Sequence, residues 1–505
     1  MRYRSVGSFA IATLLSRILG FVREGVIAYL LGAGKFSDAF YVAFRIPNLL
    51  RDLLAENAVQ NSFIPSYVEA REKGEKPENF LGTVLILLLA VSLLFLVLGL
   101  LFTPLLVSAF AYGFRGDPSK FSLTVNLTRI TFPYLLLVAL GAFAGGILLS
   151  SKKFFIPAFS PVLFNLGIIA VSLGAFLMLK GDKNIYARAL ALGVVVGGSL
   201  QLVFQLLFIP SLRINPRLDL GHPQIRKFFK LLVPVVLSTA FSRLTLFVNT
   251  LIASFLRNGA ISYLNYAFRV MHLPIGLFSV GVATVALPDI AERAARGEST
   301  GPVISKALKL TLFLTIPSAL FLILDAEKII HLLFERGSFR HIDTWLASQA
   351  LVFYALSVMP TGISKVLLGH YFSYGQTKVP NIILALSAAV NIGVALLLSP
   401  LLGFPALALA TALSSISQAL VLLFLLKDRV VWAKGGLSFA VKLAAANTAM
   451  AGLILFKNPW SWNLDLLFDL FAGGLLYVGL SAILGFEEVN FIFGKRARGD
   501  SNPQP

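Results

Sequence analysis

Long apolar segments alternate with short polar links along the whole chain. Each segment has roughly the 20 residues that a helix needs to cross a bilayer, and the links are rich in Gly, Pro and charged residues, which end helices. The pattern predicts an all-α integral membrane protein with about fourteen transmembrane helices. We expect helices over residues 6–31, 37–68, 81–112, 122–151, 155–179, 186–210, 223–256, 259–287, 303–335, 343–373, 379–400, 404–426, 436–456 and 464–487.

The amino-acid composition also indicates that most of the chain is surrounded by lipid. Hydrophobic residues make up 57% and charged residues only 13% of the 505 positions, far from the mixture of a soluble domain. The first segment carries Arg17, Arg23 and Glu24 and lacks a small-residue cleavage site, so we expect it to remain as the first helix. The chain has no cysteine, which excludes disulfides and thiolate chemistry.

The net charge of +19 is distributed unevenly between the links. Lys and Arg concentrate in alternate links, and this bias predicts that both termini lie in the cytoplasm. Anionic lipid headgroups account for the charge of the links, so no nucleic acid is needed as a partner. The links expected in the cytoplasm carry Arg71, Lys73, Lys76, Lys152, Lys153, Arg213, Arg217, Arg226, Lys227, Arg293, Arg296, Lys427, Arg429, Lys495 and Arg496.

The chain contains an internal repeat. Ser16–Val22 is echoed by Ser242–Val248, and Asn165–Gly167 by Asn391–Gly393, at the same offset of 226 residues. With six helices in each copy, both copies enter the membrane from the same side, as in transporters with parallel repeats. We therefore expect a first lobe over residues 1–215, a second lobe over 216–430, two additional helices over 431–490 and a cytoplasmic tail over 491–505.

Charged residues inside the expected helices point to function, because each costs about 2.5 to 3.5 kcal/mol at a helix centre. Arg17 with Glu24, and Arg45 with Asp52, each share a helix face, and such pairs could equally serve only to fix helix packing. Arg269 has no acidic residue within two turns of its helix. A cluster of planar guanidinium groups suits a diphosphate.

Motifs of enzymes are missing from the sequence. Gly32-Ala33-Gly34-Lys35 lacks the frame of a phosphate-binding loop and falls between two expected helices. The chain also lacks the metal-binding and nucleophile motifs of hydrolases. Together with the arginines, this predicts a protein that moves an anionic substrate and is not an enzyme.

The N-terminal motifs carry a family resemblance. The run Ser16–Glu24, the segment from Gly32 to Phe40, and Phe44–Arg51 followed by Glu56 resemble the MurJ (MviN) family of lipid II flippases, whose superfamily includes MATE exporters and polysaccharide flippases. The resemblance implies export of the undecaprenyl-diphosphate-linked peptidoglycan precursor, lipid II, to the periplasmic leaflet by alternating access. It implies that the substrate-binding residues are Arg17, Arg23, Arg51, Arg269 and Asp38, and we add Glu24 and Glu56 from the same motifs.

Several alternatives stay open from sequence. Another polyprenyl-diphosphate-linked glycan would need the same cavity chemistry, whereas a MATE-like exporter of cations should have more carboxylates than arginines; a scaffold role in a cell-wall complex would leave the arginines dispensable. Some members of the family use an aspartate of helix seven for sodium, and residues 230–255 contain none. We expect no cofactor or metal, with dependence on membrane potential or a monovalent cation gradient open, and a monomer that contacts membrane lipids and could contact cell-wall synthesis proteins.

Overall fold

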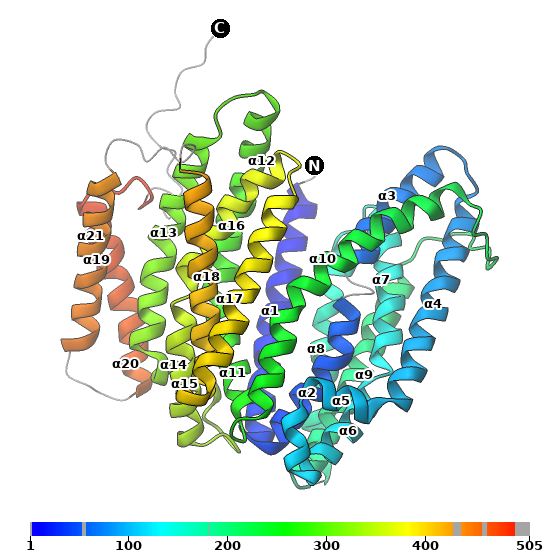
Figure 1. Cartoon of the computed structure of the whole chain (residues 1–505), viewed down its shortest axis with the longest axis horizontal. Coiled ribbons are helices and arrows are strands. Elements are labelled where there is room, and N and C mark those ends of the chain that lie inside the picture. Colours follow the sequence, from blue (N-terminus) through cyan, green and yellow to red (C-terminus); the bar gives the residue numbers. More distant parts are fainter. Residues whose placement is uncertain (1–2, 53–56, 180, 428–435, 457–461, 490–505) are drawn as a thin grey trace. The chain divides into compact units, whose positions relative to one another are not determined.

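The regular elements are helices throughout the described part of the chain (Figure 1). This computed structural model describes all residues except 1–2, 53–56, 180, 428–435, 457–461 and 490–505. The helices up to residue 254 are α1 (Tyr3–Leu31), α2 (Lys35–Arg51), α3 (Asn57–Glu72), α4 (Pro77–Leu101), α5 (Thr103–Phe110), the 3-10 turn η2 (Tyr112–Gly116), α6 (Pro118–Thr131), α7 (Tyr134–Ser150), α8 (Phe155–Leu179), α9 (Lys183–Leu207) and α10 (Pro223–Ser254).

The remaining helices include two short π-helical turns. They are α11 (Ala260–Pro274), the π turn η3 (Ile275–Ser279), α12 (Val280–Ala295), α13 (Gly301–Leu324), α14 (Ala326–Phe334), α15 (His341–Ala355), α16 (Val358–Ser373), α17 (Lys378–Leu402), α18 (Pro405–Leu425), α19 (Gly436–Phe456), α20 (Trp462–Phe468), the π turn η4 (Asp469–Gly473) and α21 (Gly474–Ile483).

Eleven helical segments among the described residues are long and apolar enough to cross a membrane. They confirm an all-α, multi-pass membrane protein. The expected helices 6–31, 37–68 and 223–256 are not among them, and these three carry Arg17, Asp38 and Arg243. The exact count of fourteen transmembrane helices therefore stays a prediction.

Several expected helices are divided in the structure. The segment expected over 81–112 consists of α4 and α5, which meet at Phe102 just before Pro104. The segment expected over 122–151 consists of α6 and α7 on either side of Pro133. Proline cannot donate the backbone hydrogen bond of an α-helix and its ring clashes with the preceding turn, so the breaks lie where the chain has this residue.

The chain divides into two compact units. The first comprises Met1–Ser262 with Arg336–Arg340, and the second comprises Tyr263–Glu335 with His341–Pro505. These units are not the two expected lobes, whose boundary at residue 215 stays a prediction.

The segment Arg336–Arg340 joins the first unit by close backbone contact with the end of α1. Ser338 donates its N–H to the carbonyl of Tyr29 at 2.8 Å. A Cβ on Gly32, which has φ +70°, would lie 2.3 Å from the carbonyl oxygen of Ser338. Only glycine fits this approach and this left-handed conformation.

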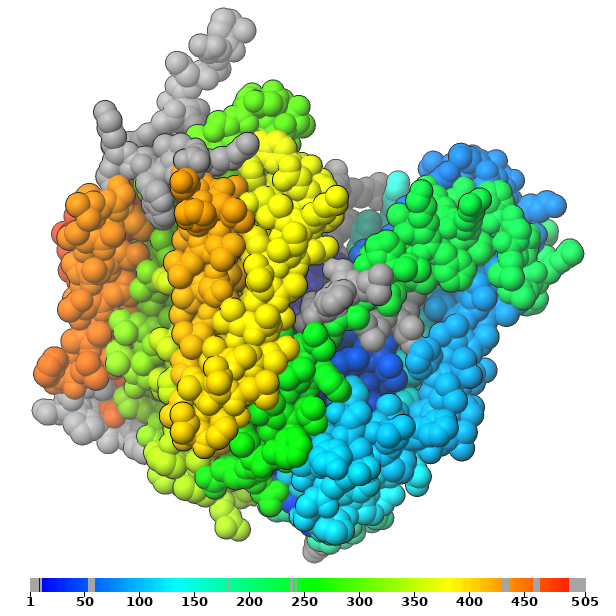
Figure 2. Space-filling model, in the orientation of Figure 1, coloured from blue at the N-terminus to red at the C-terminus, as the bar shows by residue number. Residues whose placement is uncertain are grey.

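Apolar side chains cover the outside of several helices as well as the core. On α17, Leu397 and Leu401 are 74% and 78% exposed, and Figure 2 shows this helix uncovered on the viewed face, in yellow. In water such a surface would be unfavourable. A surrounding bilayer solvates it, which agrees with the spans found above.

In the second unit, the C-terminal helices pack on α13. Leu443 and Met450 of α19 and Tyr477 of α21 are buried together with Phe313 of α13. The Tyr477 hydroxyl donates to the carbonyl of Phe313 at 2.7 Å. The two C-terminal helices are thus an integral part of the second unit.

Candidate functional site

Arg23 and Glu24 form a buried ion pair that connects three helices of the first unit. Arg23 Nη2 donates to Glu24 Oε1 at 2.6 Å, and Arg23 Nη1 donates to Asn165 Oδ1 of α8 at 3.0 Å. Tyr41 of α2 donates its hydroxyl to Glu24 Oε2 at 2.7 Å. Because both charges are buried and hydrogen-bonded, this pair suits a role in holding α1, α2 and α8 together.

The structure does not pair Glu24 with Arg17, the residue that shares its helix face. Glu24 pairs with its neighbour Arg23, and Arg17 is exposed without a hydrogen bond or ion pair to any described residue. Of the two arginines singled out in α1, Arg17 is therefore the one that can offer its guanidinium group to a ligand. A substrate contact by Arg23 or Glu24 stays a prediction.

A second cluster places two arginines around one carboxylate. Asp52 accepts from Arg51 Nη2 at 2.8 Å and Nε at 3.1 Å, and its other oxygen pairs with Arg243 Nη2 of α10 at 3.0 Å. Arg51 Nη1 also donates to the hydroxyl of Tyr134 at 3.3 Å. The cluster carries two positive charges and one negative charge, so it has a surplus suited to an anion. Arg45, the other partner considered for Asp52, instead donates to Thr250 Oγ1 at 2.5 Å.

Arg243 is not among the substrate-binding residues predicted from the sequence. Its Nε is buried and has no hydrogen-bond partner among the described residues, so the cluster retains an unused donor. The internal repeat held the signal, because Arg243 is the counterpart of Arg17 at the offset of 226 residues. That equivalence would have justified giving both arginines the same candidate role.

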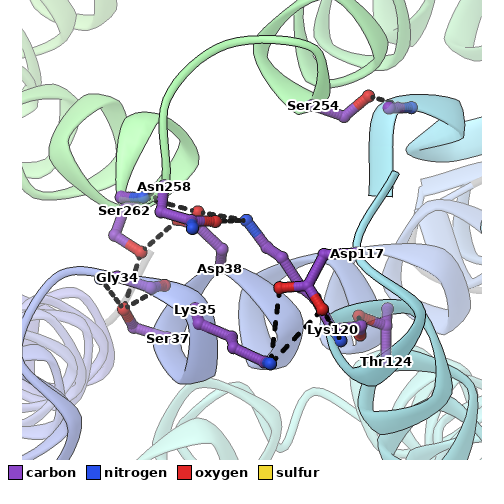
Figure 3. A network of polar contacts seen from close by, with 12 residues as sticks. Gly34, Lys35, Ser37, Asp38, Asp117, Lys120, Thr124, Ser254, Asn258 and Ser262 are labelled. Carbon is purple, nitrogen blue, oxygen red and sulfur yellow. Dashed lines mark hydrogen bonds and ion pairs between the residues drawn. The ribbon is translucent and has the colours of Figure 1, made fainter. Parts of the chain in front are cut away.

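Asp38 lies at the centre of a buried polar network (Figure 3). Its oxygens accept from the backbone N–H of Gly259 at 2.7 Å, from the N–H and hydroxyl of Ser262 at 3.0 and 2.7 Å, and from Lys120 Nζ at 2.9 Å. Lys120 also donates to Asn258 Oδ1 at 2.8 Å. With its acceptors filled, Asp38 fastens α2 to α6 and to the first turn of α11, and its proposed substrate contact stays a prediction.

Arg269 and Glu56 complete the set of residues singled out from sequence. Arg269 is exposed on α11 in the second unit, and its joining the arginines of the first unit stays a prediction. His272, three residues on, is hydrogen-bonded through Nδ1 to the carbonyl oxygen of Phe268 at 3.1 Å. Glu56 lies outside the described residues.

Candidate ligands for a cation were compared among the described side chains. No three His, Asp or Glu residues among them lie together as metal ligands. In the second unit, Asn391 Nδ2 donates to Thr411 Oγ1 at 3.3 Å, and both groups are neutral. Dependence on a cation gradient stays an expectation.

The apolar spans and the partly exposed arginine cluster around Asp52 fit a multi-pass membrane transporter of an anion. The family model described as "Lipid II flippase MurJ" matches residues 27–469. The chain belongs to this family.

The similarity to known relatives, in sequence and in structure, extends over most of the chain. The lipid II flippase MurJ of Burkholderia cenocepacia is 34% identical over 459 residues, which cover 88% of this chain and 87% of that protein. A probable lipid II flippase MurJ of Aquifex aeolicus is 34% identical over 468 residues, covering 91% and 90%. A solved structure titled "Lipid II flippase MurJ, inward closed conformation" is 29% identical, with TM-score 0.82 and coverage of 94% of this chain and 98% of that one.

A multidrug MATE transporter of the MOP superfamily in an inward-facing conformation shares the fold. Its TM-score is 0.68 at 15% identity, and the match covers 83% of this chain and 98% of that one. The fold resemblance to the MOP superfamily is thereby confirmed, together with the family resemblance seen in the N-terminal motifs.

Proposed function

We propose that this protein moves lipid II from the cytoplasmic to the periplasmic leaflet of the bacterial inner membrane by alternating access, without catalysing a reaction. The observation that carries the proposal is the cluster of Arg51 and Arg243 around Asp52, in a chain of the lipid II flippase family. Guanidinium forks match the oxygens of a diphosphate and remain charged at every physiological pH.

The charges of substrate and protein suit transport along the membrane potential. An inside-negative potential favours outward movement of an anion by about 2.3 kcal/mol per charge per 100 mV when the whole field is crossed. The empty arginine cluster is cationic, so the same field favours its return. In this scheme Arg17, Arg51, Arg243 and Arg269 bind the diphosphate while the prenyl chain stays in lipid.

Both termini lie in the cytoplasm in this proposal, and membrane lipids and lipid II are the partners. The support is the excess of Lys and Arg in the links on that side. A monomer suffices for the scheme, because the arginines that it uses belong to one chain.

Complementation tests the function. A strain depleted of its own lipid II flippase would receive the wild type or Arg17→Ala, Arg51→Ala, Arg243→Ala or Arg269→Ala at equal expression. Arg226→Ala is the matched control, since Arg226 is an exposed arginine at the start of α10. We expect the wild type and Arg226→Ala to restore growth and the four other variants to fail. The corresponding Lys variants should restore growth only in part, because Lys keeps the charge but loses the fork.

Each other outcome has a definite meaning. A well-expressed, correctly inserted wild type that does not restore growth would contradict lipid II as substrate. Rescue by all four alanine variants would contradict binding of the diphosphate by these arginines and leave the substrate assignment standing.

A further inference from the structure

The outer face of α6 carries a stripe of polar residues inside a membrane span. Beyond Pro118, the exposed residues of this helix are Ser119, Ser122, Asn126 and Arg129. Their spacing puts them on one face of the helix. The helix belongs to the span Pro118–Ser150, and acyl chains solvate polar and charged groups poorly. The polar stripe therefore needs a partner other than acyl chains.

The polar stripe points away from α2, which carries Arg51 and Asp52. Lys120 donates from Nζ to Asp38 Oδ2 of α2 at 2.9 Å. Thr131 donates from Oγ1 to a backbone carbonyl of α2 at 3.1 Å. At about 100° per residue, Arg129 points roughly 160° to 180° away from both of these residues. Arg129 is therefore separate from the arginine clusters described above.

The helices beside α6 have apolar outer surfaces. Both α5 and α9 pack against α6. On α5, Leu105 is 63% exposed. The exposed large side chains along α9 beyond its first turns include Leu192, Val196, Leu200 and Val203. A bilayer solvates such surfaces, so the polar stripe of α6 differs from its surroundings.

Arg129 is the charged member of the polar stripe. It forms no hydrogen bond or ion pair with any residue that the structure describes. Side chains of a helix lean towards its N-terminus, so the guanidinium group leans towards Asn126 and the start of α6. A straight helix of the 33 residues in this span is about 50 Å long, which exceeds the roughly 40 to 45 Å of a bilayer with its headgroups. The start of α6 therefore reaches the level of the lipid phosphates.

The donors of the polar stripe suit a phosphate group. The guanidinium fork of Arg129 matches two phosphate oxygens, and the amide of Asn126 and the hydroxyl of Ser122 can donate to others. A second copy of the chain fits less well. A twofold interface through this face would be self-complementary and would bring Arg129 towards its own counterpart, and the polar stripe contains no acidic residue to compensate.

We propose that Ser122, Asn126 and Arg129 form a binding site for the phosphate group of an anionic phospholipid on the outer face of the first unit. The lipid belongs to the leaflet at the start of α6, which the charge bias of the links predicts to be the periplasmic one. This inference does not depend on the proposed function, because the polar stripe points away from the helix that carries Arg51.

Fluorescence quenching in nanodiscs tests the proposal, because the chain has no native cysteine. A bimane fluorophore is attached at Ile130→Cys, a half-buried position beside Arg129. Brominated phosphatidylglycerol and brominated phosphatidylcholine are compared as quenchers at equal mole fraction. We expect phosphatidylglycerol to associate about fivefold more strongly, the ratio that one further charge gives near a membrane surface.

Variants locate the effect in the polar stripe. Arg129→Ala should bring the ratio to about one, and Arg129→Lys should keep part of it, because Lys retains the charge but loses the fork. Asn126→Leu should weaken the association of both lipids, since both carry a phosphate. Arg257→Ala removes an exposed arginine outside the polar stripe and is the matched control. A second probe at Leu200→Cys on α9 should be quenched equally by both lipids.

The other outcomes decide against the proposal. Equal quenching by both lipids at Ile130→Cys, or an unchanged ratio in Arg129→Ala, would overturn it. Weak quenching by both lipids would show that protein covers this face and would overturn it as well. Displacement of brominated phosphatidylglycerol by lipid II, but not by the same amount of unlabelled phosphatidylglycerol, would assign the polar stripe to a diphosphate instead. If Arg129→Ala does not fold, the ratio measured with Arg129 in place decides alone.

Discussion

At the scale of single residues, the buried pair of Arg23 and Glu24 allows a test of a structural role. Glu24→Ala would leave the guanidinium group of Arg23 without its carboxylate partner in a buried position. Breaking a buried ion pair in this way costs about 3 to 5 kcal/mol. We expect this loss in the free energy of unfolding of the purified protein in detergent, without substrate. Glu298→Ala, which removes an exposed carboxylate, should change it by less than about 0.5 kcal/mol; a stable Glu24→Ala variant would contradict the structural role.

Asp38 and Lys120 form a second buried pair with a different test. Asp38→Asn leaves the Lys120 ammonium uncompensated, and Lys120→Met leaves the carboxylate with its neutral donors only. Each single change should lower the free energy of unfolding by about 3 kcal/mol or more. The double variant should lose clearly less than the sum of the two, because neither charge is left unpaired. Additive losses in thermal or denaturant unfolding would show that the two groups are not coupled.

These residues also show what the sequence can predict of the site. Sequence patterns located the charges in α1 and α2, because such charges are rare in apolar segments. They could not give the partners. Arg23 meets Asn165 and Asp38 meets Lys120 through contacts that join positions 142 and 82 residues apart, and a helix wheel contains only the neighbours on one helix.

At the scale of elements, the close packing of α8 on α9 depends on glycine. A Cβ on Gly197 of α9 would lie 2.4 Å from the carbonyl oxygen of Phe164 on α8, and small residues permit such approach between membrane helices. Gly197→Ala should therefore push the helices apart and lower the free energy of unfolding by about 1 to 3 kcal/mol. Gly174→Ala on α8 is the matched control, because nothing lies within 4 Å of its added Cβ. An unchanged melting temperature of Gly197→Ala would contradict this account.

The ends of helices could be predicted better than their interruptions. The expected helix over 155–179 and that over 436–456 coincide with α8 and α19, because apolar runs end where polar residues begin. The breaks at Phe102 and Pro133 were not predicted. Proline is tolerated inside α8 at Pro161 as well as at these breaks, so its presence alone does not tell a kink from a new helix.

At the scale of the whole molecule, the repeat and the charge distribution made the transporter class predictable from sequence. The N-terminal motifs narrowed the substrate from several anionic lipids to lipid II, and the family model agrees with that resemblance. Side-chain periodicity and charge bias report on one helix or one link at a time. They cannot give the arrangement of distant helices, which is why Arg243 was missed as the partner of Asp52.

The proposed direction of transport depends on which links face the cytoplasm, and the absence of native cysteine makes this testable. A cysteine introduced by Gly116→Cys lies in η2, in open space, on the side expected to be periplasmic. One introduced by Glu298→Cys lies at an exposed position in a link expected to be cytoplasmic. In intact cells with a permeable outer membrane, a membrane-impermeant maleimide should label the first variant, and the second only after the inner membrane is opened. The cysteine-free wild type is the control for background. The reverse labelling pattern would invert the topology, and the arginine clusters would then have to receive the diphosphate from the opposite leaflet.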